Sequence, residues 1–117
     1  MTGTRKKPVS KKILREIVRR IVEVASPERI ILFGSAARGT MGPRSDLDIL
    51  VIKAGTYHSR DIATKIYMNL YGLGRAFDII VVTPEQVEKY WNSPYVVIGP
   101  AMQEGMVIYD AETITAR

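Results

Sequence analysis

The sequence predicts an α/β domain in which a small mixed sheet of three to four strands is covered by helices. Short runs of β-branched and large apolar residues alternate along the chain with longer segments whose apolar residues recur at helical spacing. The length of 117 residues is enough for one compact domain. A composition of 46% hydrophobic and 25% charged residues is typical of a globular protein, and it excludes a mainly disordered chain or a fibrous repeat.

The first helix is expected to run from a cap at Ser10 to about Val24, because its apolar residues form one stripe. The stripe consists of Ile13, Leu14, Ile17, Val18, Ile21 and Val22. The Ser-Pro pair that follows ends this helix. Residues 1–9 are basic and lack periodicity, so we expect a flexible basic tail before a single domain that spans residues 10–117.

Apolar runs predict the strands, which are Arg29–Phe33, Asp46–Lys53, Ala76–Val82 and a short edge segment, Met106–Tyr109. Residues 35–45 contain two glycines and a proline, which predicts a short helix or turn followed by a loop. Helical spacing predicts a helix over Ser59–Tyr71, and two further helices are expected over 84–91 and near 95–104. Ser59 is expected to cap the first of them, and Thr83 followed by Pro84 is a strong start signal for the second.

The composition also excludes several kinds of site. The chain has no cysteine, which excludes disulfides, zinc–thiolate centres, iron–sulfur clusters and a cysteine nucleophile. Its single histidine cannot form a His-rich metal site alone. No apolar run approaches the roughly 18 residues of a membrane span, and no apolar segment of a secretory signal follows the basic N-terminus. We therefore expect a cytoplasmic protein that does not contact a membrane.

The net charge of +5 is unevenly distributed. Residues 1–20 hold eight Lys or Arg against one acid, a net charge of +7. Residues 21–117 hold nine basic and eleven acidic residues, a net charge of −2. We therefore do not expect direct nucleic-acid binding. A basic N-terminal segment that binds nucleic acid weakly, with a strong salt dependence, remains an alternative.

A Gly-Ser pair, Gly34 and Ser35, ends the first predicted strand. Glycine permits close backbone approach to a ligand, and a turn that opens a helix presents N–H groups that suit phosphate. The Ser35 hydroxyl adds a further donor. Such a pair at a strand end is, by itself, usually only a turn.

Two acids, Asp46 and Asp48, begin the second predicted strand. Residues two apart on a strand point to one face, so the two carboxylates lie side by side while Leu47 points into the core. Like charges beside a buried strand are costly unless a cation neutralises them, and hard oxygen ligands favour Mg²⁺ or Mn²⁺. Two solvated acids at a strand end are the alternative.

A third acid, Asp78, lies within the apolar run of the third strand, where a buried aspartate is rare unless it is paired or bound to metal. If this strand lies beside the strand of Asp46 and Asp48, three carboxylates meet at one edge of the site. Such a set can hold two metal ions for in-line nucleotidyl transfer, with Asp78 also accepting the proton of the attacking group.

The order of Gly34 and Ser35, ten residues, Asp46 and Asp48, and then a third acid resembles the nucleotidyltransferase superfamily that includes DNA polymerase beta. The stretch Gly34–Val51 is similar to the minimal nucleotidyltransferases, the MNT family. The resemblance implies a nucleotidyltransferase fold, two Mg²⁺ ions and ATP as the second substrate. It implies that Gly34, Ser35 and Arg38 contact the nucleotide phosphates. It also implies that Asp46, Asp48 and Asp78 are catalytic and bind the metal ions.

The family also implies a partner. The MNT family is typically encoded with a HEPN-domain protein, an all-α ribonuclease toxin. The resemblance implies an antitoxin that transfers AMP from ATP to a tyrosine of this toxin and forms a hetero-oligomer with it. A binding-only antitoxin that covers the toxin without catalysis is the alternative. Apolar and aromatic residues in the C-terminal third are consistent with docking, or with helices packed on the domain's own sheet: Tyr90, Trp91, Tyr95, Val96, Val97, Ile98 and Met102.

Overall fold

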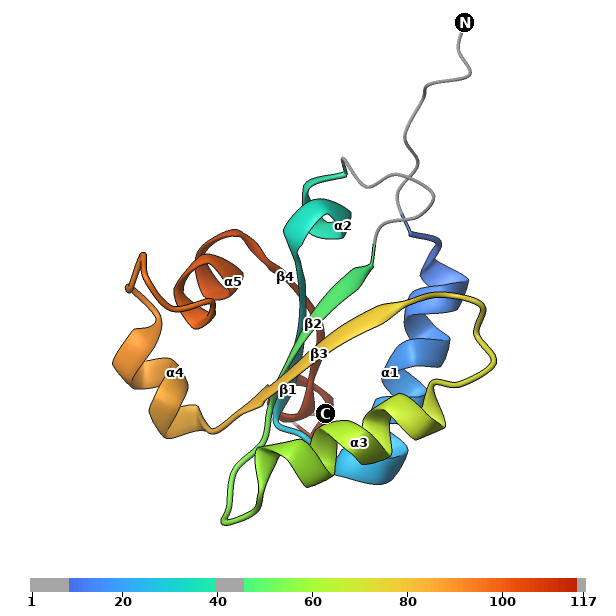
Figure 1. Cartoon of the computed structure of the whole chain (residues 1–117), viewed down its shortest axis with the longest axis horizontal. Helices are drawn as coiled ribbons and strands as arrows, with labels where there is room; N and C mark the ends of the chain where they lie inside the picture. The colour runs from blue at the N-terminus through green and yellow to red at the C-terminus, as the bar shows by residue number, and fades with distance from the viewer. Residues whose placement is uncertain (1–8, 40–45, 116–117) are drawn as a thin grey trace, which may run out of the picture.

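The structure is a computed structural model that describes residues 9–39 and 46–115. Four strands form one mixed sheet in the order β3-β2-β1-β4, with helices on both faces (Figure 1). The strands are β1 (Arg29–Phe33), β2 (Leu47–Ile52), β3 (Phe77–Val82) and β4 (Met106–Asp110). The helices are α1 (Lys11–Ala25), α2 (Gly34–Arg38), α3 (Ser59–Asn69), α4 (Pro84–Tyr90), α5 (Ile98–Glu104) and α6 (Ala111–Thr115). The predicted α/β class and the small mixed sheet are confirmed.

The sheet combines both strand directions. β1 runs antiparallel to β2 and to β4, whereas β2 and β3 are parallel and are connected through α3. The pairing places Phe33, Asp48 and Asp78 in one row across β1, β2 and β3. This row lies where β1 ends and where β2 and β3 begin, so it joins the three segments that carry the predicted site.

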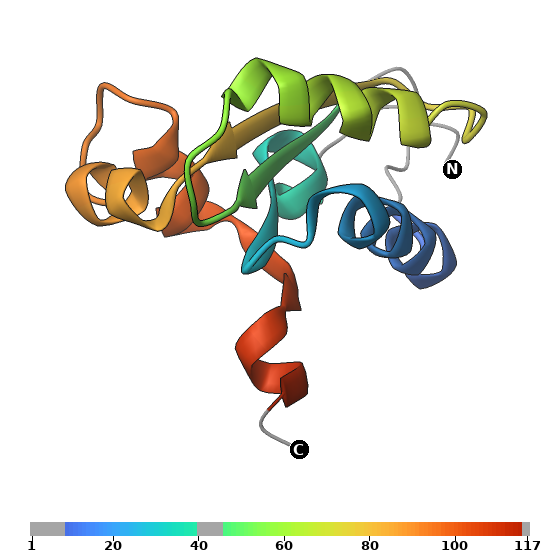
Figure 2. The same ribbon diagram turned by 90° about the horizontal axis from the view of Figure 1, so that it is seen from below.

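Each face of the sheet has its own apolar layer, because side chains along a strand alternate between the faces. α1 and α3 pack on one face, and α4 and α5 on the other (Figures 1 and 2). The buried residues of the first layer include Ile17, Ile21, Leu47, Ile49, Val51 and Ile66. Those of the second layer include Ile31, Leu50, Ile52, Val82, Ile98 and Ala101. In the part of the chain that the structure describes, no helix is long and apolar enough to cross a membrane.

Two of the predicted helix starts are confirmed. The Ser10 hydroxyl accepts a hydrogen bond from the Ile13 N–H at 3.2 Å and caps α1. Thr83 caps α4 through a reciprocal pair of hydrogen bonds with Gln86, the arrangement known as a capping box. The predicted basic tail falls on residues 1–8, which lie outside the described residues, and on Val9, which packs against the core.

Other local predictions need correction. Ser59 does not cap α3, because His58 occupies the N-cap position, without a side-chain hydrogen bond, and Ser59 is the first helical residue. α3 ends at Asn69, two residues earlier than predicted, and α5 begins only at Ile98. The short helix α6 was not predicted, since five residues are too few for a helical apolar pattern.

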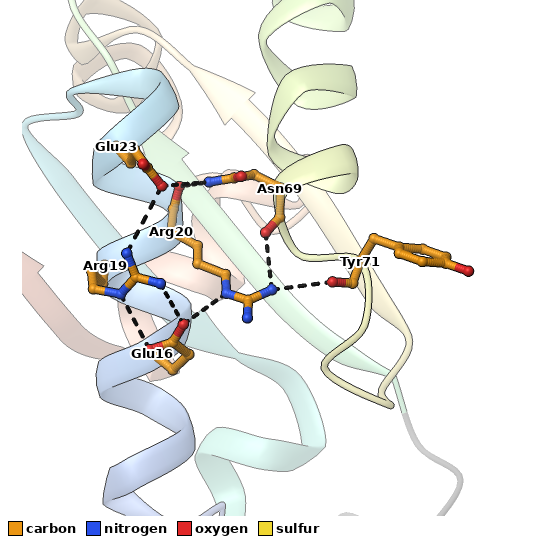
Figure 3. A network of polar contacts seen from close by, with 6 residues as sticks. All are labelled: Glu16, Arg19, Arg20, Glu23, Asn69 and Tyr71. Carbon is orange, nitrogen blue, oxygen red and sulfur yellow. Dashed lines mark hydrogen bonds and ion pairs between the residues drawn. The ribbon is translucent and has the colours of Figure 1, made fainter.

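Arg20 ties α1 to the C-terminal end of α3 (Figure 3). Its Nη1 donates to the carbonyl oxygens of Asn69 and Tyr71 at 3.2 and 3.1 Å, and its Nε donates to Glu16 at 2.8 Å. The last carbonyl groups of a helix have no partner within the helix, so Arg20 supplies donors that α3 lacks.

Hydrogen bonds from Arg19 and then from Arg20 lower the pKa of Glu16 to about 2. Stability from this carboxylate is therefore present above its ordinary pKa of 4.5 and is lost as the pH falls through about 2.

We expect Arg20→Met to lower the free energy of unfolding by about 1–2 kcal/mol, because the substitution keeps the apolar stem but removes the donors to α3. Urea denaturation measures this change. Arg19→Met is the matched control, since the Arg19 guanidinium contacts only Glu16 and Glu23 on its own helix among the described residues. The control is expected to lose much less, because the Arg19 pairs are exposed to solvent. Equal losses in the two variants would contradict a role for the contact between the helices.

Candidate active site

Asp48 and Asp78 are direct neighbours on the two parallel strands. They lie on the face that α4 and α5 cover, because the alternate residues Leu50 and Ile80 of the same strands pack in that layer. Asp48 is half-buried and Asp78 is exposed. The two carboxylates therefore lie at the end of an otherwise apolar face, at a point that is open to solvent.

The exposure of Asp78 corrects one expectation. The sequence predicts an acid inside a buried strand, but Asp78 is exposed while the next residue, Ile79, is buried. The reason is that β3 is an edge strand and Asp78 is only its second residue, on the opposite face from Phe77 and Ile79. The acid that burial does affect is Asp48.

Asp48 is the acid of the site whose pKa is shifted. Its pKa is raised above 3.8, mainly by burial and further by the carboxylates of Asp78 and Asp46, whereas the Arg38 guanidinium opposes the rise. Asp46 is exposed directly before β2, and Leu47 between the two acids is fully buried. Asp46, Asp78 and Arg38 are therefore each close enough to act electrostatically on Asp48, as a single site requires.

Gly34 lies against the Asp48 carboxylate. β1 ends at Phe33, which pairs with Asp48, and α2 begins at the next residue. Gly34 has a φ of +71°, in the left-handed region that favours glycine. A Cβ atom at this position would overlap Asp48 Oδ2 and would lie 3.1 Å from Asp48 Cγ. Glycine is therefore required here both by the backbone and by the space that the carboxylate occupies.

Ser35 and Arg38 lie on the short helix α2. Ser35 is half-buried and directly follows Gly34, and the Ala36 beside it is buried in the core. Arg38 is exposed at the other end of α2, where its Nη1 lies 3.9 Å from Glu104 Oε1 at the end of α5. Both side chains of this pair are more than half exposed, so the pair itself contributes little to stability.

Sequence reasoning missed Glu104. It is the last residue of a predicted helix, and nothing in the local sequence distinguishes it from a solvated acid. Its contact with Arg38 arises only because α5 packs beside α2. Arg38 is therefore close enough to interact both with Asp48 of the sheet and with Glu104 of α5.

The donor set suits a hard divalent cation in kind, since the ligands are carboxylates and the pKa of Asp48 is raised first by burial and then by the carboxylates of Asp78 and Asp46. The spacing of these carboxylates is less favourable for binding an ion. Within residues 9–39 and 46–115, no group of three or more His, Asp or Glu side chains is close enough to hold a metal ion as it stands. An ion held by all three acids together would therefore require their side chains to rearrange.

The apolar and aromatic residues of the C-terminal third were expected either to dock on a partner or to pack on the domain's own sheet, and the structure shows both buried and exposed residues among them. Ile98 is buried, and Tyr90, Val96 and Met102 pack partly against the layer under α4 and α5. Trp91, Tyr95 and Val97 are exposed, and Tyr95 has 93% of its surface accessible. Some of the predicted docking residues are thus part of the domain's own core, while three others are available at the surface.

Comparison with known proteins assigns most of the chain to a family. The family described as the nucleotidyltransferase domain matches residues 11–99, from the start of α1 into α5. The chain belongs to this family. No match was found among the curated proteins.

Solved structures share the fold. A candidate nucleotidyltransferase from Sulfolobus solfataricus has 22% identity and a TM-score of 0.61, and the match covers 86% of this chain and 80% of that one. A chain of a toxin–antitoxin complex with AMP-PNP has 20% identity and a TM-score of 0.60, and the match covers 88% and 77%. The complex of tri-AMPylated Shewanella oneidensis HEPN toxin with MNT antitoxin gives 16% identity and a TM-score of 0.56, covering 91% and 76%. At these identities the likeness shows the fold, and the structural neighbours include MNT antitoxins.

Proposed function

We propose that this protein is a Mg²⁺-dependent nucleotidyltransferase that transfers AMP from ATP to a tyrosine of a HEPN-domain toxin in the cytoplasm, and so acts as the antitoxin. The observation that carries the proposal is the contact of Gly34 with Asp48, in register with Asp78. This contact joins the predicted phosphate-binding turn to the predicted metal-binding acids. The fold shared with MNT antitoxins supports the choice of partner.

In this proposal, Asp46, Asp48 and Asp78 would hold two Mg²⁺ ions, or Mn²⁺, and bound ions would neutralise phosphate charge and lower the pKa of the attacking hydroxyl. Gly34 allows the triphosphate to approach the backbone, and the Ser35 hydroxyl donates to a phosphate oxygen. Arg38 offers its guanidinium to the phosphates in place of Glu104.

The chemical step joins the tyrosine hydroxyl oxygen to the α-phosphorus of ATP and breaks the bond between that phosphorus and the bridging oxygen of the leaving pyrophosphate. The hydroxyl proton passes to Asp78. The exposure of Asp78 at the sheet edge supports this role, because a side chain of a separate protein can reach an exposed carboxylate. Asp48, half-buried between its neighbours, is better suited to hold a cation.

The mass of a co-expressed HEPN partner tests the proposal. With ATP and Mg²⁺, we expect the intact partner to gain one or more adenylyl groups, and fragmentation to locate each of them on a tyrosine. Chelation of divalent cations should prevent the gain, because the acids cannot hold the triphosphate without positive charge. A partner that keeps its unmodified mass under these conditions would contradict the proposed transfer.

A binding-only antitoxin is the second candidate. It is favoured by the finding that no group of three or more His, Asp or Glu side chains in the described part of the chain is close enough to hold a metal ion. Under this alternative, Asp48→Asn should protect cells from the toxin as fully as the unmodified antitoxin does. Under the proposed transfer, protection should be lost although the two proteins still bind each other.

A further inference from the structure

A groove of about 470 Å³ lies between α1 and the edge strand β4. Three apolar side chains and three basic side chains line it, and these are Leu14, Val18 and Ile108, with Lys11, Arg15 and Arg19. None of the six belongs to the acid site. The groove is therefore a feature that the proposed chemistry does not explain.

The apolar part of the groove arises because the apolar stripe on α1 extends past the edge of the sheet. Ile17 and Ile21 form one row of the stripe and are fully buried. Leu14 and Val18 form the adjacent row and are only half-buried, because the sheet ends at β4. An apolar row along one helix, left half-covered at the edge of a sheet, is a surface on which another element can pack.

A bulge in β4 completes the groove. Ile30 pairs with Tyr109 but Ile31 pairs with Val107, so Ile108 is an extra residue on the edge strand. A bulge turns the side chain of the extra residue and interrupts the regular pattern of backbone hydrogen bonds, which disfavours the addition of a further strand. The groove is therefore better suited to a helix than to an extended segment.

The basic side of the groove determines the charge of its ligand. Lys11, Arg15 and Arg19 are four residues apart and form a row beside the apolar one. Arg19 pairs with Glu16, but Lys11 and Arg15 have no acidic partner among the described residues. Two uncompensated cations beside an apolar surface favour a ligand that carries carboxylates.

The same charges disfavour the occupants that this chain itself offers. A second copy packed groove to groove would bring its own basic row against this one, and the residues before Val9 contain three basic residues and no acid. The acidic helix α4 uses Val87 and Tyr90 to pack on its own sheet. A separate protein is therefore the source that fits.

We propose that the groove between α1 and β4 is a docking site for an amphipathic helix of a partner protein. The apolar row of that helix packs on Leu14, Val18 and Ile108, and its carboxylates meet Lys11 and Arg15. The inference rests on the proposed function for the existence of a partner, and it assigns the contact to a surface outside the acid site.

Two synthetic helical peptides test this surface. Both carry leucine at helical spacing and no tyrosine, and one has glutamate while the other has lysine beside the leucines. The acidic peptide is expected to bind, more weakly as salt increases, and the basic peptide is not. The double variant with Lys11→Glu and Arg15→Glu should lose about tenfold in affinity for the acidic peptide and gain affinity for the basic one.

The matched control is the double variant with Lys12→Glu and Lys65→Glu, which changes the net charge equally at exposed residues outside the groove. Its affinity for the acidic peptide should change by less than about twofold. Equal losses in the two double variants, no binding of the acidic peptide, or NMR shifts that avoid Leu14, Val18 and Ile108 would each overturn the proposal. Sedimentation that shows self-association through the groove would overturn it as well.

These measurements need neither ATP nor metal, so they are independent of transfer. Asp48→Asn should bind the acidic peptide as well as the unmodified protein does, because the acid site takes no part in docking. Loss of AMP transfer with intact peptide binding would contradict the proposed chemistry alone. Intact transfer with no binding in the groove would contradict the docking site alone.

Discussion

Asp48→Asn is expected to abolish AMP transfer and at the same time to stabilise the fold. Asparagine keeps the shape of the side chain but removes the charge that would hold a cation, so the loss should be on the order of 10³-fold, or about 4 kcal/mol of transition-state stabilisation. Stability should rise because the Asp48 carboxylate is half-buried beside two other acids. Transfer of labelled AMP and thermal unfolding measure the two effects.

The control for Asp48→Asn is Glu88→Gln, which removes the same charge from an exposed residue of α4. It should change neither transfer nor the melting temperature. Added Mg²⁺ should raise the melting temperature of the unmodified protein more than that of Asp48→Asn, because a cation relieves the repulsion that the substitution has already removed. An Asp48→Asn variant with full transfer activity, or one less stable than the unmodified protein without metal, would contradict the assigned role.

The stabilising effect of Asp48→Asn should depend on pH. Because the pKa of Asp48 is raised in the folded state, the folded protein binds more protons than the unfolded chain just above pH 3.8. Stability therefore falls as the pH rises from 3.8 through the folded-state pKa, and it then stays lower. The difference in melting temperature between Asp48→Asn and the unmodified protein should be larger at neutral pH than near the ordinary pKa. A difference that is constant with pH would show that charge is not its cause.

Local sequence patterns predicted most of the fold. The strands were found because their apolar runs fill the two buried faces of the sheet, and the caps at Ser10 and Thr83 because their hydrogen bonds are local. The neighbouring positions of Asp48 and Asp78 followed from strands that carry one acid each near their start, provided that those strands are adjacent. The sequence left this adjacency as a condition, and the parallel pairing of β2 and β3 in the structure meets it.

The remaining features depend on contacts between distant segments. Asp78 is exposed because β3 is at the edge of the sheet, and strand order cannot be read from the composition of one strand. The pairing of Arg38 with Glu104 requires α2 and α5 to be neighbours. Likewise, the half-covered row of α1 that contains Leu14 exists only because the sheet ends at β4. Each of these features is a consequence of packing, to which periodicity within one segment is insensitive.

Gly34→Ala should impair the site through the position of Asp48. The added methyl group would overlap Asp48 Oδ2, so the carboxylate must move away from the end of β1. The left-handed φ of +71° adds a backbone cost of about 1–2 kcal/mol for any residue with a Cβ. We expect a loss of about 10²-fold in AMP transfer, because a displacement of about 1 Å in a reacting geometry has effects of that size.

Gly74→Ala separates the two causes. Gly74 has nearly the same φ, +73°, and no atom of the described residues lies within 4 Å of a Cβ placed there. Both variants should therefore lose similar stability from the backbone, as urea denaturation can measure, while only Gly34→Ala should lose transfer. Equal AMP-transfer activity of the two variants would mean that the close approach of Gly34 to Asp48 is not needed to position the Asp48 carboxylate for transfer. An activity loss confined to Gly34→Ala would tie the Gly-Ser turn to the acids as one functional unit, because only that variant displaces the carboxylate.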